Sequence, residues 1–303
     1  MATERDDKGL MMGEIKAQLK SGDAARSTTR RTGDVSRSRC HMATHIKGCL
    51  IVLLTLFVIM QAVGFLLLDQ LMFHPEMVCG GYGADIPGFV DIGTKGNRIA
   101  AVRIGPEHGR KAVLFCHGNA QDITAVECLR PLADAGFTVL AVDYPGYGLS
   151  DGKTTEEGCY RNVHYAYEWL VAKGFAPADI IVAGYSIGTG PATELASTQR
   201  VGGLFLVAPF LSAPRAVTRI RVLLKDAFPN VERIHSVACP VAIVHGEEDA
   251  LVPFAQGRMC YERTREPKRF VAVSGAGHVD VMNILGGEAL LSVVEWICSE
   301  MNP

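Results

Sequence analysis

From about residue 95 onward, short apolar runs alternate with amphipathic stretches, and this alternation constrains the fold more than any other feature. The runs with the length of strands are residues 99–104, 112–116, 138–142, 180–183, 204–207, 241–244 and 270–273. Between them, helical spacing of apolar side chains occurs over residues 122–135, 155–173, 188–198 and 287–301. Continuous apolar strands that alternate with helices predict an α/β fold, in which helices cover both faces of a mostly parallel central sheet. Because such sheets place their sites at the carboxyl ends of the strands, we expect functional residues just after these runs.

The composition is that of an ordinary folded protein. The chain has 303 residues, of which 48% are hydrophobic and 20% charged, and its formal net charge is −2. Disordered chains combine low hydrophobicity with high net charge, so most of this chain must pack. Its length suits one large α/β domain or two small ones. A net charge near zero gives no general attraction to polyanions, which argues against a nucleic-acid partner.

The nine cysteines are odd in number and scattered along the chain. No two of them form a C-x-x-C pair, so they predict neither a disulfide framework nor a zinc or redox centre. Their spacing leaves open whether one pair is bridged. We expect no metal ion and no organic cofactor.

Residues 49–68 carry no charged side chain, and only Thr55 and Gln61 break the apolar run. A helix of this length rises about 30 Å, which is enough to cross a bilayer, and buried core helices rarely stay apolar on every face for so long. A cleaved signal peptide is the competing explanation, but the run is long for one and no A-x-A-like site follows it. The sequence therefore predicts a single transmembrane signal-anchor helix.

Positive charge gathers on the N-terminal side of this helix. Residues 1–48 are polar and basic and are expected to form a disordered cytoplasmic segment, although a start at Met42 would leave Lys47 as its only fixed positive charge. Residues 69–94, the expected linker leading into the fold, contain no Lys or Arg. The positive-inside rule then places the N-terminus in the cytoplasm and the domain of residues 95–303 on the extracytoplasmic or lumenal side.

The run 180–183 leads into Gly184-Tyr185-Ser186-Ile187-Gly188 and then into a helix, which is a G-x-S-x-G pattern in strand–turn–helix context. A serine on so tight a turn has a strained backbone that exposes its hydroxyl. The flanking glycines are needed where strand and helix approach too closely for a Cβ atom. The turn also directs the Ile187 N–H and the helix N-terminus at a developing oxyanion. Ser186 is therefore the candidate nucleophile.

A second G-x-S-x-G match contains Ser150, inside the loop DYPGYGLSDG at 143–152. Ser150 lies several residues past its strand among turn-forming residues, which indicates a loop and not an elbow. The tripeptide GKT at 152–154 resembles the end of a phosphate-binding P-loop, but Tyr147 stands where that motif needs its first glycine. The sequence favours Ser186 over Ser150 and argues against a nucleotide hydrolase.

A serine hydroxyl needs a base to take its proton and an acid to orient that base. In proteins with this elbow the chain order is Ser, acid, His, and the histidines downstream of Ser186 are His235, His245 and His278. His278 lies in a glycine-rich turn after a strand-like run, where an exposed base can reach the elbow. His235 lies in a helical or irregular stretch and His245 is expected to be a structural turn residue, so His278 is the candidate base.

The segment HGEEDALVP follows the strand-like run 241–244 and offers Glu247, Glu248 and Asp249 as the acid. Asp249 precedes a short apolar segment, in a loop that can turn back toward His278. Asp280 is only two positions from His278 and is poorly placed to orient its Nδ1 atom. Asp249 is therefore the candidate acid, and the two glutamates are expected on a solvated face.

An oxyanion hole needs a second N–H from the loop after an earlier strand. His117-Gly118-Asn119-Ala120 follows the run 112–116, and Gly118 permits close approach to the elbow. We expect the backbone N–H of Asn119 to act together with that of Ile187. His117 precedes Ser186 in the chain and is expected to fix this loop.

Together these motifs resemble the α/β-hydrolase superfamily over about residues 85–300. They are HGNA at 117–120, DYPGYGLSDG at 143–152, GYSIGTGPA at 184–192, HGEEDALVP at 245–253 and GAGHVD at 275–280. The combination looks like the branch of small membrane-anchored hydrolases that are serine aminopeptidase-like or depalmitoylase-like. The resemblance implies Ser186 as nucleophile, Asp249 as acid and His278 as base, and it implies a structural role for the loop 143–152.

Only residues 208–240 separate two successive strands at the place where related enzymes with a large helical lid insert far more. A minimal lid leaves the site open, which fits an acyl chain presented from a membrane or an exposed ester. It argues against the deep pocket of an exopeptidase. Palmitoyl-protein thioesterases of this branch face the cytosol and are held by lipidated cysteines, whereas here a span replaces those cysteines and the charge rule places the domain outside.

The sequence therefore predicts a membrane-anchored serine hydrolase that cleaves carboxylic ester, thioester or lipid acyl bonds through a Ser-His-Asp triad and an acyl-enzyme intermediate. Its expected partners are the membrane and an acyl ester or thioester, including a lipid or a lipidated protein. Two alternatives stay open: a serine aminopeptidase-like amide hydrolase, and a non-catalytic membrane-anchored binding protein on the same fold.

Overall fold

The computed structural model describes Met42 and residues 45–64, 66–67, 69–70, 72–77, 81–218 and 226–301. Most of the basic segment expected over residues 1–48 lies outside this range. The chain divides into two compact units, Met1–Val63 and Gly64–Pro303. In the first unit the helix His45–Gly64 is long and apolar enough to cross a membrane, and its side chains are exposed, for example Leu53 at 62%. This helix coincides with most of the apolar run that the sequence singles out.

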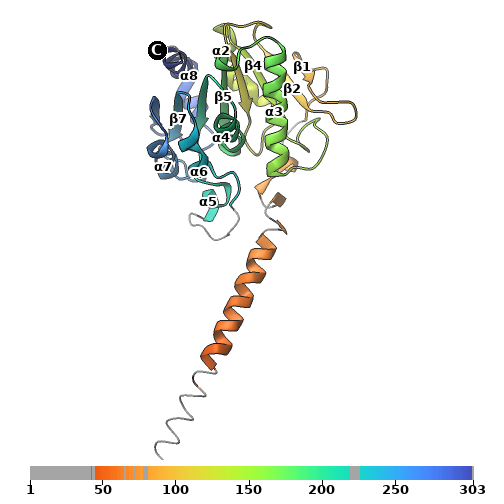
Figure 1. Ribbon diagram of the computed structural model, residues 1–303. Coiled ribbons are helices and arrows are strands. Elements are labelled where there is room, and N and C mark those ends of the chain that lie inside the picture. The colour runs from red at the N-terminus through yellow and green to blue at the C-terminus, as the bar shows by residue number, and fades with distance from the viewer. Residues whose placement is uncertain are drawn as a thin grey trace, which may run out of the picture. The chain divides into compact units, whose positions relative to one another are not determined.

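The second unit is built on one eight-stranded sheet with the strand order β1-β2-β4-β3-β5-β6-β7-β8 (Figure 1). The pairs β1–β2 and β2–β4 are antiparallel, and all the other pairs are parallel. The strands are β1 (Phe89–Asp91), β2 (Ala100–Ile104), β3 (Ala112–Cys116), β4 (Thr138–Val142), β5 (Ile180–Tyr185), β6 (Gly203–Val207), β7 (Val241–Gly246) and β8 (Lys268–Val273). The predicted α/β class with a mostly parallel sheet is confirmed.

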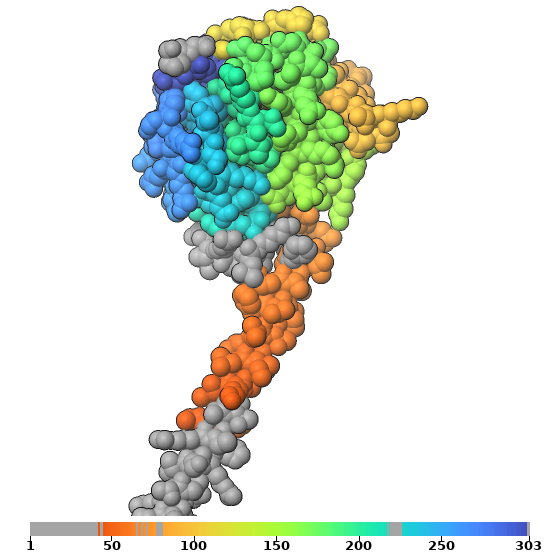
Figure 2. Space-filling view, viewed as in Figure 1, coloured from red at the N-terminus to blue at the C-terminus, as the bar shows by residue number. Residues whose placement is uncertain are grey.

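Helices cover both faces of this sheet. The helices are α2 (Arg130–Asp134), α3 (Glu156–Ala172), α4 (Thr189–Thr198), α5 (Ala213–Thr218), α6 (Asn230–Arg233), α7 (Phe254–Arg263) and α8 (Val281–Glu300). Short 3-10 helices are η1 (Pro75–Met77), η2 (Ile123–Leu129), η3 (Pro177–Asp179), η4 (Ser186–Gly188) and η5 (Ile234–Ser236). Side chains of α3, α4, α6 and α7 pack on one face, and side chains of η2, α2 and α8 pack on the other. In Figure 2 the green and blue-green atoms of α3 and α4 cover the first of these faces.

The alternation of side chains along a strand explains why these runs are apolar throughout. In β3, Leu114 joins the core under α3 and α4, whereas its neighbours Val113 and Phe115 join the core under η2 and α8. The helix limits also follow local chemistry. Thr155 accepts a hydrogen bond from the Gly158 N–H at 3.0 Å and caps α3.

Helix α7 lies outside the helical stretches that the sequence predicts, and three further differences concern the entry to the sheet, the stretch 122–135 and helix α8. The sheet begins upstream of residue 95, because the half-exposed strand β1 pairs with β2. The stretch 122–135 forms the 3-10 helix η2 followed by the short helix α2. Helix α8 begins at Val281, and Gly286, with φ of 76°, separates its first turn from the predicted amphipathic part. Although α8 is also long and apolar enough to span a membrane, it belongs to the core of this unit through Val293, Val294 and Ile297.

Candidate active site

Ser186 follows β5 directly and lies on a sharp turn into α4. Its φ is 54°, in the left-handed region that is costly for a residue with a side chain, by about 1–3 kcal/mol. A Cβ atom on Gly184 would lie 2.5 Å from the Gly188 carbonyl oxygen, and one on Gly188 would lie 2.1 Å from that of Cys116. Both glycines are therefore required by backbone contact, as the G-x-S-x-G pattern predicts.

The histidine and the acid come from the loops after β8 and β7, at the same edge of the sheet as the turn. His278 Nε2 lies 2.8 Å from Ser186 Oγ, and His278 Nδ1 lies 2.7 Å from Asp249 Oδ2. The His278 ring stacks on Tyr185, with centroids 5.6 Å apart, and the Tyr185 hydroxyl donates to the His278 carbonyl at 2.5 Å. The structure thus brings together the three residues expected as nucleophile, base and acid.

Asp249 is buried at the centre of a shell of donors. Its Oδ1 accepts hydrogen bonds from the backbone N–H of Leu251 at 3.0 Å and of Val252 at 2.7 Å. Burial alone raises the pKa of this carboxyl, but hydrogen bonds from His245 and His278 outweigh burial, and the net pKa lies well below its ordinary value. The carboxylate is therefore ionised at neutral pH and suited to accept a hydrogen bond from the Nδ1–H of His278.

His245 contributes a contact that the sequence did not reveal. Its buried ring places Nε2 2.9 Å from the Val252 carbonyl oxygen and 3.3 Å from Asp249 Oδ2. Gly257 leaves room for the ring, because a Cβ there would lie 2.2 Å from its Nδ1. The four-residue spacing of His245 and Asp249 was the only available signal, and it does not distinguish a contact from a plain turn.

The other candidates for acid and base lie elsewhere. Glu247 and Glu248 are exposed, as expected, and His235 is exposed as well. Asp280 accepts a hydrogen bond from the Gly277 N–H at 2.7 Å and so stabilises the turn that carries His278. Within the described residues, the Ser186 hydroxyl pairs with His278 and with none of these four.

Ser150, in the second G-x-S-x-G match, has its hydroxyl engaged by the backbone. Its Oγ accepts from the Ala100 N–H at 2.9 Å and donates to the Asp143 carbonyl at 3.2 Å. The side chain of Ser150 is buried, and its backbone lacks the positive φ that Ser186 has. Ser150 therefore tethers the loop after β4 to the start of β2.

The loop after β3, which carries Asn119, rests against the elbow. A Cβ on Gly118 would lie 3.0 Å from the Tyr185 ring, and one on Gly188 would lie 2.6 Å from the His117 carbonyl oxygen. The Asn119 backbone N–H has no hydrogen-bond acceptor within the part of the chain that the structure describes. Ile187 is in the first turn of η4, where N–H groups lack an intrahelical acceptor. These two groups belong to neighbouring segments at the Ser186 turn.

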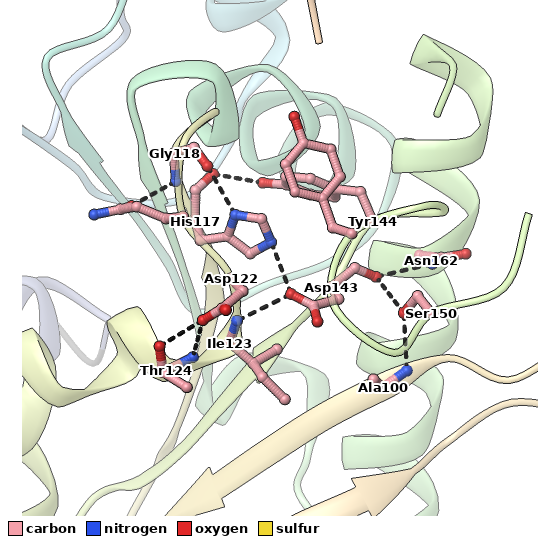
Figure 3. A network of polar contacts seen from close by, with 12 residues as sticks. Ala100, His117, Gly118, Asp122, Ile123, Thr124, Asp143, Tyr144, Ser150 and Asn162 are labelled. Carbon is pink, nitrogen blue, oxygen red and sulfur yellow. Dashed lines mark hydrogen bonds and ion pairs between the residues drawn. The ribbon is translucent and has the colours of Figure 1, made fainter. Parts of the chain in front are cut away.

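A buried network fixes this loop from beneath (Figure 3). His117 Nε2 lies 3.1 Å from Asp143 Oδ1, and His117 Nδ1 lies 2.8 Å from the Gly118 carbonyl oxygen. Asp143 Oδ1 also accepts from the Ile123 N–H at 2.9 Å, and the Tyr82 hydroxyl donates to Oδ2. Both nitrogens of His117 thus face oxygen atoms inside the protein, which agrees with the expected role in holding the loop.

A cavity of about 190 Å³ lies beside Tyr185, the residue before the elbow serine. It is lined by the polar side chains Gln121 and Asn283 and by apolar side chains that include Phe205 and Met282. A cavity of about 150 Å³ already holds a benzene-sized molecule. This cavity could therefore hold a small apolar group beside Tyr185, and its lining does not include Ser186, His278 or Asp249.

The described cysteines of the second unit are poor nucleophiles near neutral pH, because burial raises the pKa of their thiols. The seven that the structure describes are all free, while Cys40 and Cys79 lie outside the described residues. Burial raises the pKa of the Cys128, Cys239 and Cys260 thiols to about 12. Since the thiolate is the reactive form of cysteine, these groups are inert at pH 7.

Comparisons with known proteins agree with this architecture. A family model described as the alpha/beta hydrolase fold matches residues 111–231. Alpha/beta hydrolase domain-containing protein 17B of Homo sapiens is 34% identical over 222 residues, which cover 70% of this chain and 75% of that protein. Alpha/beta hydrolase domain-containing protein aho-3 of Caenorhabditis elegans is 36% identical over 193 residues, or 61% and 58% of the two chains.

Two solved structures show the same fold at low sequence identity. The Pyrococcus furiosus esterase Pf2001 has a TM-score of 0.60 at 19% identity and covers 74% of this chain and 98% of its own. Est1E from Butyrivibrio proteoclasticus, with ferulic acid bound, has a TM-score of 0.57 at 19% identity and covers 71% of this chain and 100% of its own. At these identities the likeness concerns the fold alone.

Proposed function

Because the chain belongs to the α/β-hydrolase superfamily, in the branch that its motifs resemble, we propose that it is a serine hydrolase. In this proposal Ser186 is the nucleophile, His278 is the base and Asp249 is the orienting acid. The observation that carries this proposal is the continuous line of contacts from Asp249 through His278 to the hydroxyl of Ser186, at 2.7 and 2.8 Å. These are the distances and the order that nucleophilic catalysis by serine needs.

In the proposed reaction, Ser186 Oγ attacks the carbonyl carbon of an acyl group while His278 Nε2 takes the hydroxyl proton. The backbone N–H groups of Asn119 and Ile187 stabilise the oxyanion. When the tetrahedral intermediate collapses, the leaving alcohol or thiol takes the proton from His278 and an acyl-enzyme remains. Water then attacks the acyl-enzyme with His278 as base, releases the carboxylic acid and restores Ser186. Asp249 holds the Nδ1–H of the imidazolium throughout.

The proposed substrates are carboxylic esters, thioesters or lipid acyl bonds, including those of a lipidated protein. The segment between β6 and β7 contains only α5, α6 and η5 as described helices, so no large helical lid is present within its described residues. Such a site suits an acyl group presented from outside the protein. Amide hydrolysis in the manner of a serine aminopeptidase is less favoured, because an exopeptidase needs an enclosed pocket for a free amino terminus.

The helix His45–Gly64 is proposed to anchor the enzyme in a membrane as a single span. The basic residues before it favour a cytoplasmic N-terminus and an extracytoplasmic or lumenal domain. Protease treatment of sealed membranes tests this orientation with a tag at each terminus. The C-terminal tag should be protected in vesicles whose cytoplasmic face is outside, and digestion of that tag with survival of the N-terminal tag would reverse the proposed orientation.

A fluorophosphonate probe, which reacts with activated serines, tests the nucleophile. The wild type should be labelled, Ser186→Ala should not, and Ser150→Ala should be labelled like the wild type. Ser150 is the matched control because it occupies the second G-x-S-x-G segment and its hydroxyl serves only the backbone. Labelling that persists in folded Ser186→Ala, or that is lost in Ser150→Ala alone, would contradict the proposal.

A further inference from the structure

Residues 72–74, which we call the strap, precede the first strand and pack into the domain. The side chain of Phe73 is buried, and its ring meets that of Phe228 edge to face, with centroids 5.8 Å apart. Phe228 in turn lies against Gly190 of α4, where a Cβ would come within 2.3 Å of the ring. Through Phe73 the strap therefore adjoins the helix that begins at the Ser186 turn.

The main chain of the strap is bound by the side chain of Asn119. Asn119 Nδ2 donates to the Met72 carbonyl at 2.8 Å, and the His74 N–H donates to Asn119 Oδ1 at 3.2 Å. The Tyr147 hydroxyl donates to the same Oδ1 at 2.6 Å and also lies 3.3 Å from the His74 nitrogen. The Asn119 amide thus uses both its oxygen and its nitrogen, and two of its three partners belong to the strap.

The three residues of the loop after β3 are held in different ways. The His117 ring is held by Asp143, and the Gly118 N–H donates to Gln121 Oε1 at 2.8 Å, so both contacts come from within the domain. Asn119, whose backbone N–H is directed to the oxyanion in the proposed reaction, is held mainly by the strap. The position of this N–H therefore depends on a segment that lies 45 or more residues earlier in the chain.

We propose that the strap is a positioning element of the active site, which fixes the Asn119 backbone N–H relative to that of Ile187. This inference rests on the proposed function, and it makes residues 72–74 part of the support of the oxyanion hole. One donor of an oxyanion hole contributes about 10²–10³ to kcat, and a displacement of about 1 Å costs up to about 10². Loss of the strap contacts should therefore lower kcat by about ten- to 100-fold and leave KM nearly unchanged.

Variants of the full-length chain test this with an activated ester as substrate. Asn119→Ala removes the hydrogen bonds to the strap and keeps the backbone N–H, while Phe73→Ala removes the apolar anchor. Phe73→Leu keeps an apolar side chain and should recover most of the activity. Glu76→Ala is the matched control, because Glu76 is exposed just beyond the strap and, among the described residues, its carboxylate pairs with His74 Nδ1 and not with Asn119.

The inhibition constant of a trifluoromethyl ketone analogue of the ester supplies a second measurement. It would not change if the strap only stabilised the fold. Ser186 adds to this ketone to form a tetrahedral oxyanion, so its inhibition constant reports on the oxyanion hole. In Asn119→Ala and Phe73→Ala this constant should rise by about the same factor by which kcat falls. In Glu76→Ala and Phe73→Leu it should stay within about twofold of the wild type.

The outcomes separate the inference from the proposed function. If folded Asn119→Ala and Phe73→Ala keep the kcat and inhibitor affinity of the wild type, or lose only melting temperature, the strap inference is wrong. If Phe73→Ala does not fold, the kcat and inhibitor affinity of Asn119→Ala decide the question, because Asn119 is only half-buried. If Ser186→Ala keeps full activity, the proposed function is wrong, and the strap inference falls with it.

Discussion

His117–Asp143 and His278–Asp249 are both histidine–aspartate pairs near the carboxyl ends of strands, but of these two only His278–Asp249 faces a serine. In the pair His117–Asp143 both side chains are fully buried, and the second ring nitrogen lies 2.8 Å from a backbone carbonyl oxygen. In the pair His278–Asp249 the histidine is 9% exposed, and its second ring nitrogen lies 2.8 Å from Ser186 Oγ. A histidine–acid pair can therefore act as a base only where its free nitrogen meets a hydroxyl that substrate can reach.

The largest expected effect is the loss of the base. His278→Ala should lower kcat/KM by about 10⁵-fold or more, because the Ser186 hydroxyl then has no group to take its proton. The chain should still fold, because His278 lies in a surface turn. Ester hydrolysis and circular dichroism measure the two properties, and an activity loss below tenfold in a folded variant would show that His278 is not the base.

The next effect concerns the acid of the same pair. Asp249→Asn should lower kcat by about 10⁴-fold, because an amide at this position favours the wrong tautomer of His278. The matched variant Asp143→Asn should leave the activity of the folded fraction within about tenfold of the wild type. Active-site titration with the fluorophosphonate probe gives that fraction, and a larger loss in Asp143→Asn than in Asp249→Asn would reverse the roles of the two pairs.

The free energy of unfolding should depend more on the pair His117–Asp143 than on the pair His278–Asp249. His117→Ala leaves Asp143 buried without its histidine and should lower the free energy of unfolding by about 3–5 kcal/mol. It also removes the side chain that holds the loop at residues 117–120. Urea denaturation measures this change, and a loss below about 1 kcal/mol would mean that the buried pair does not hold the loop.

The smallest effect tests a third pair, His164–Glu194, which joins α3 to α4 at 2.9 Å. The hydrogen bond from Glu194 raises the pKa of His164 above its ordinary value, against the effect of partial burial. The stabilisation is therefore complete below the pKa of the unfolded chain and disappears as the pH rises through the folded pKa. His164→Gln should destabilise the protein by about 1 kcal/mol or less at pH 5.5 and by still less at pH 9. Equal losses at both pH values would contradict this assignment.

Local patterns in the sequence predicted the core strands and the Ser186 turn, because both depend on neighbours in the chain. The turn needs Gly184 and Gly188 for backbone contact, and a pattern of five residues records that need directly. The apolar runs likewise record strands that are buried on both faces, as β3 to β7 are. The short strand β1 escaped prediction because it is half-exposed and antiparallel, so it has neither a continuous apolar run nor a following helix.

Contacts that depend on how the chain folds back on itself could not be read in the same way. The hydrogen bonds of Asn119 with residues 72–74 join segments that no shared motif connects. The contact of His245 with Asp249 depends on the curvature of the loop after β7 and on the space above Gly257. Such contacts follow from packing in three dimensions, which the periodicity of one segment does not encode.

The most direct test of the central claim is to locate the acyl-enzyme. The purified full-length protein is mixed with an activated ester, quenched in acid within the first turnover, digested and analysed by peptide mass spectrometry. The account predicts a single acyl group on Ser186, and its absence in Ser186→Ala. An acyl group on Ser150 or on a cysteine, or rapid turnover with no acylated Ser186, would contradict the account.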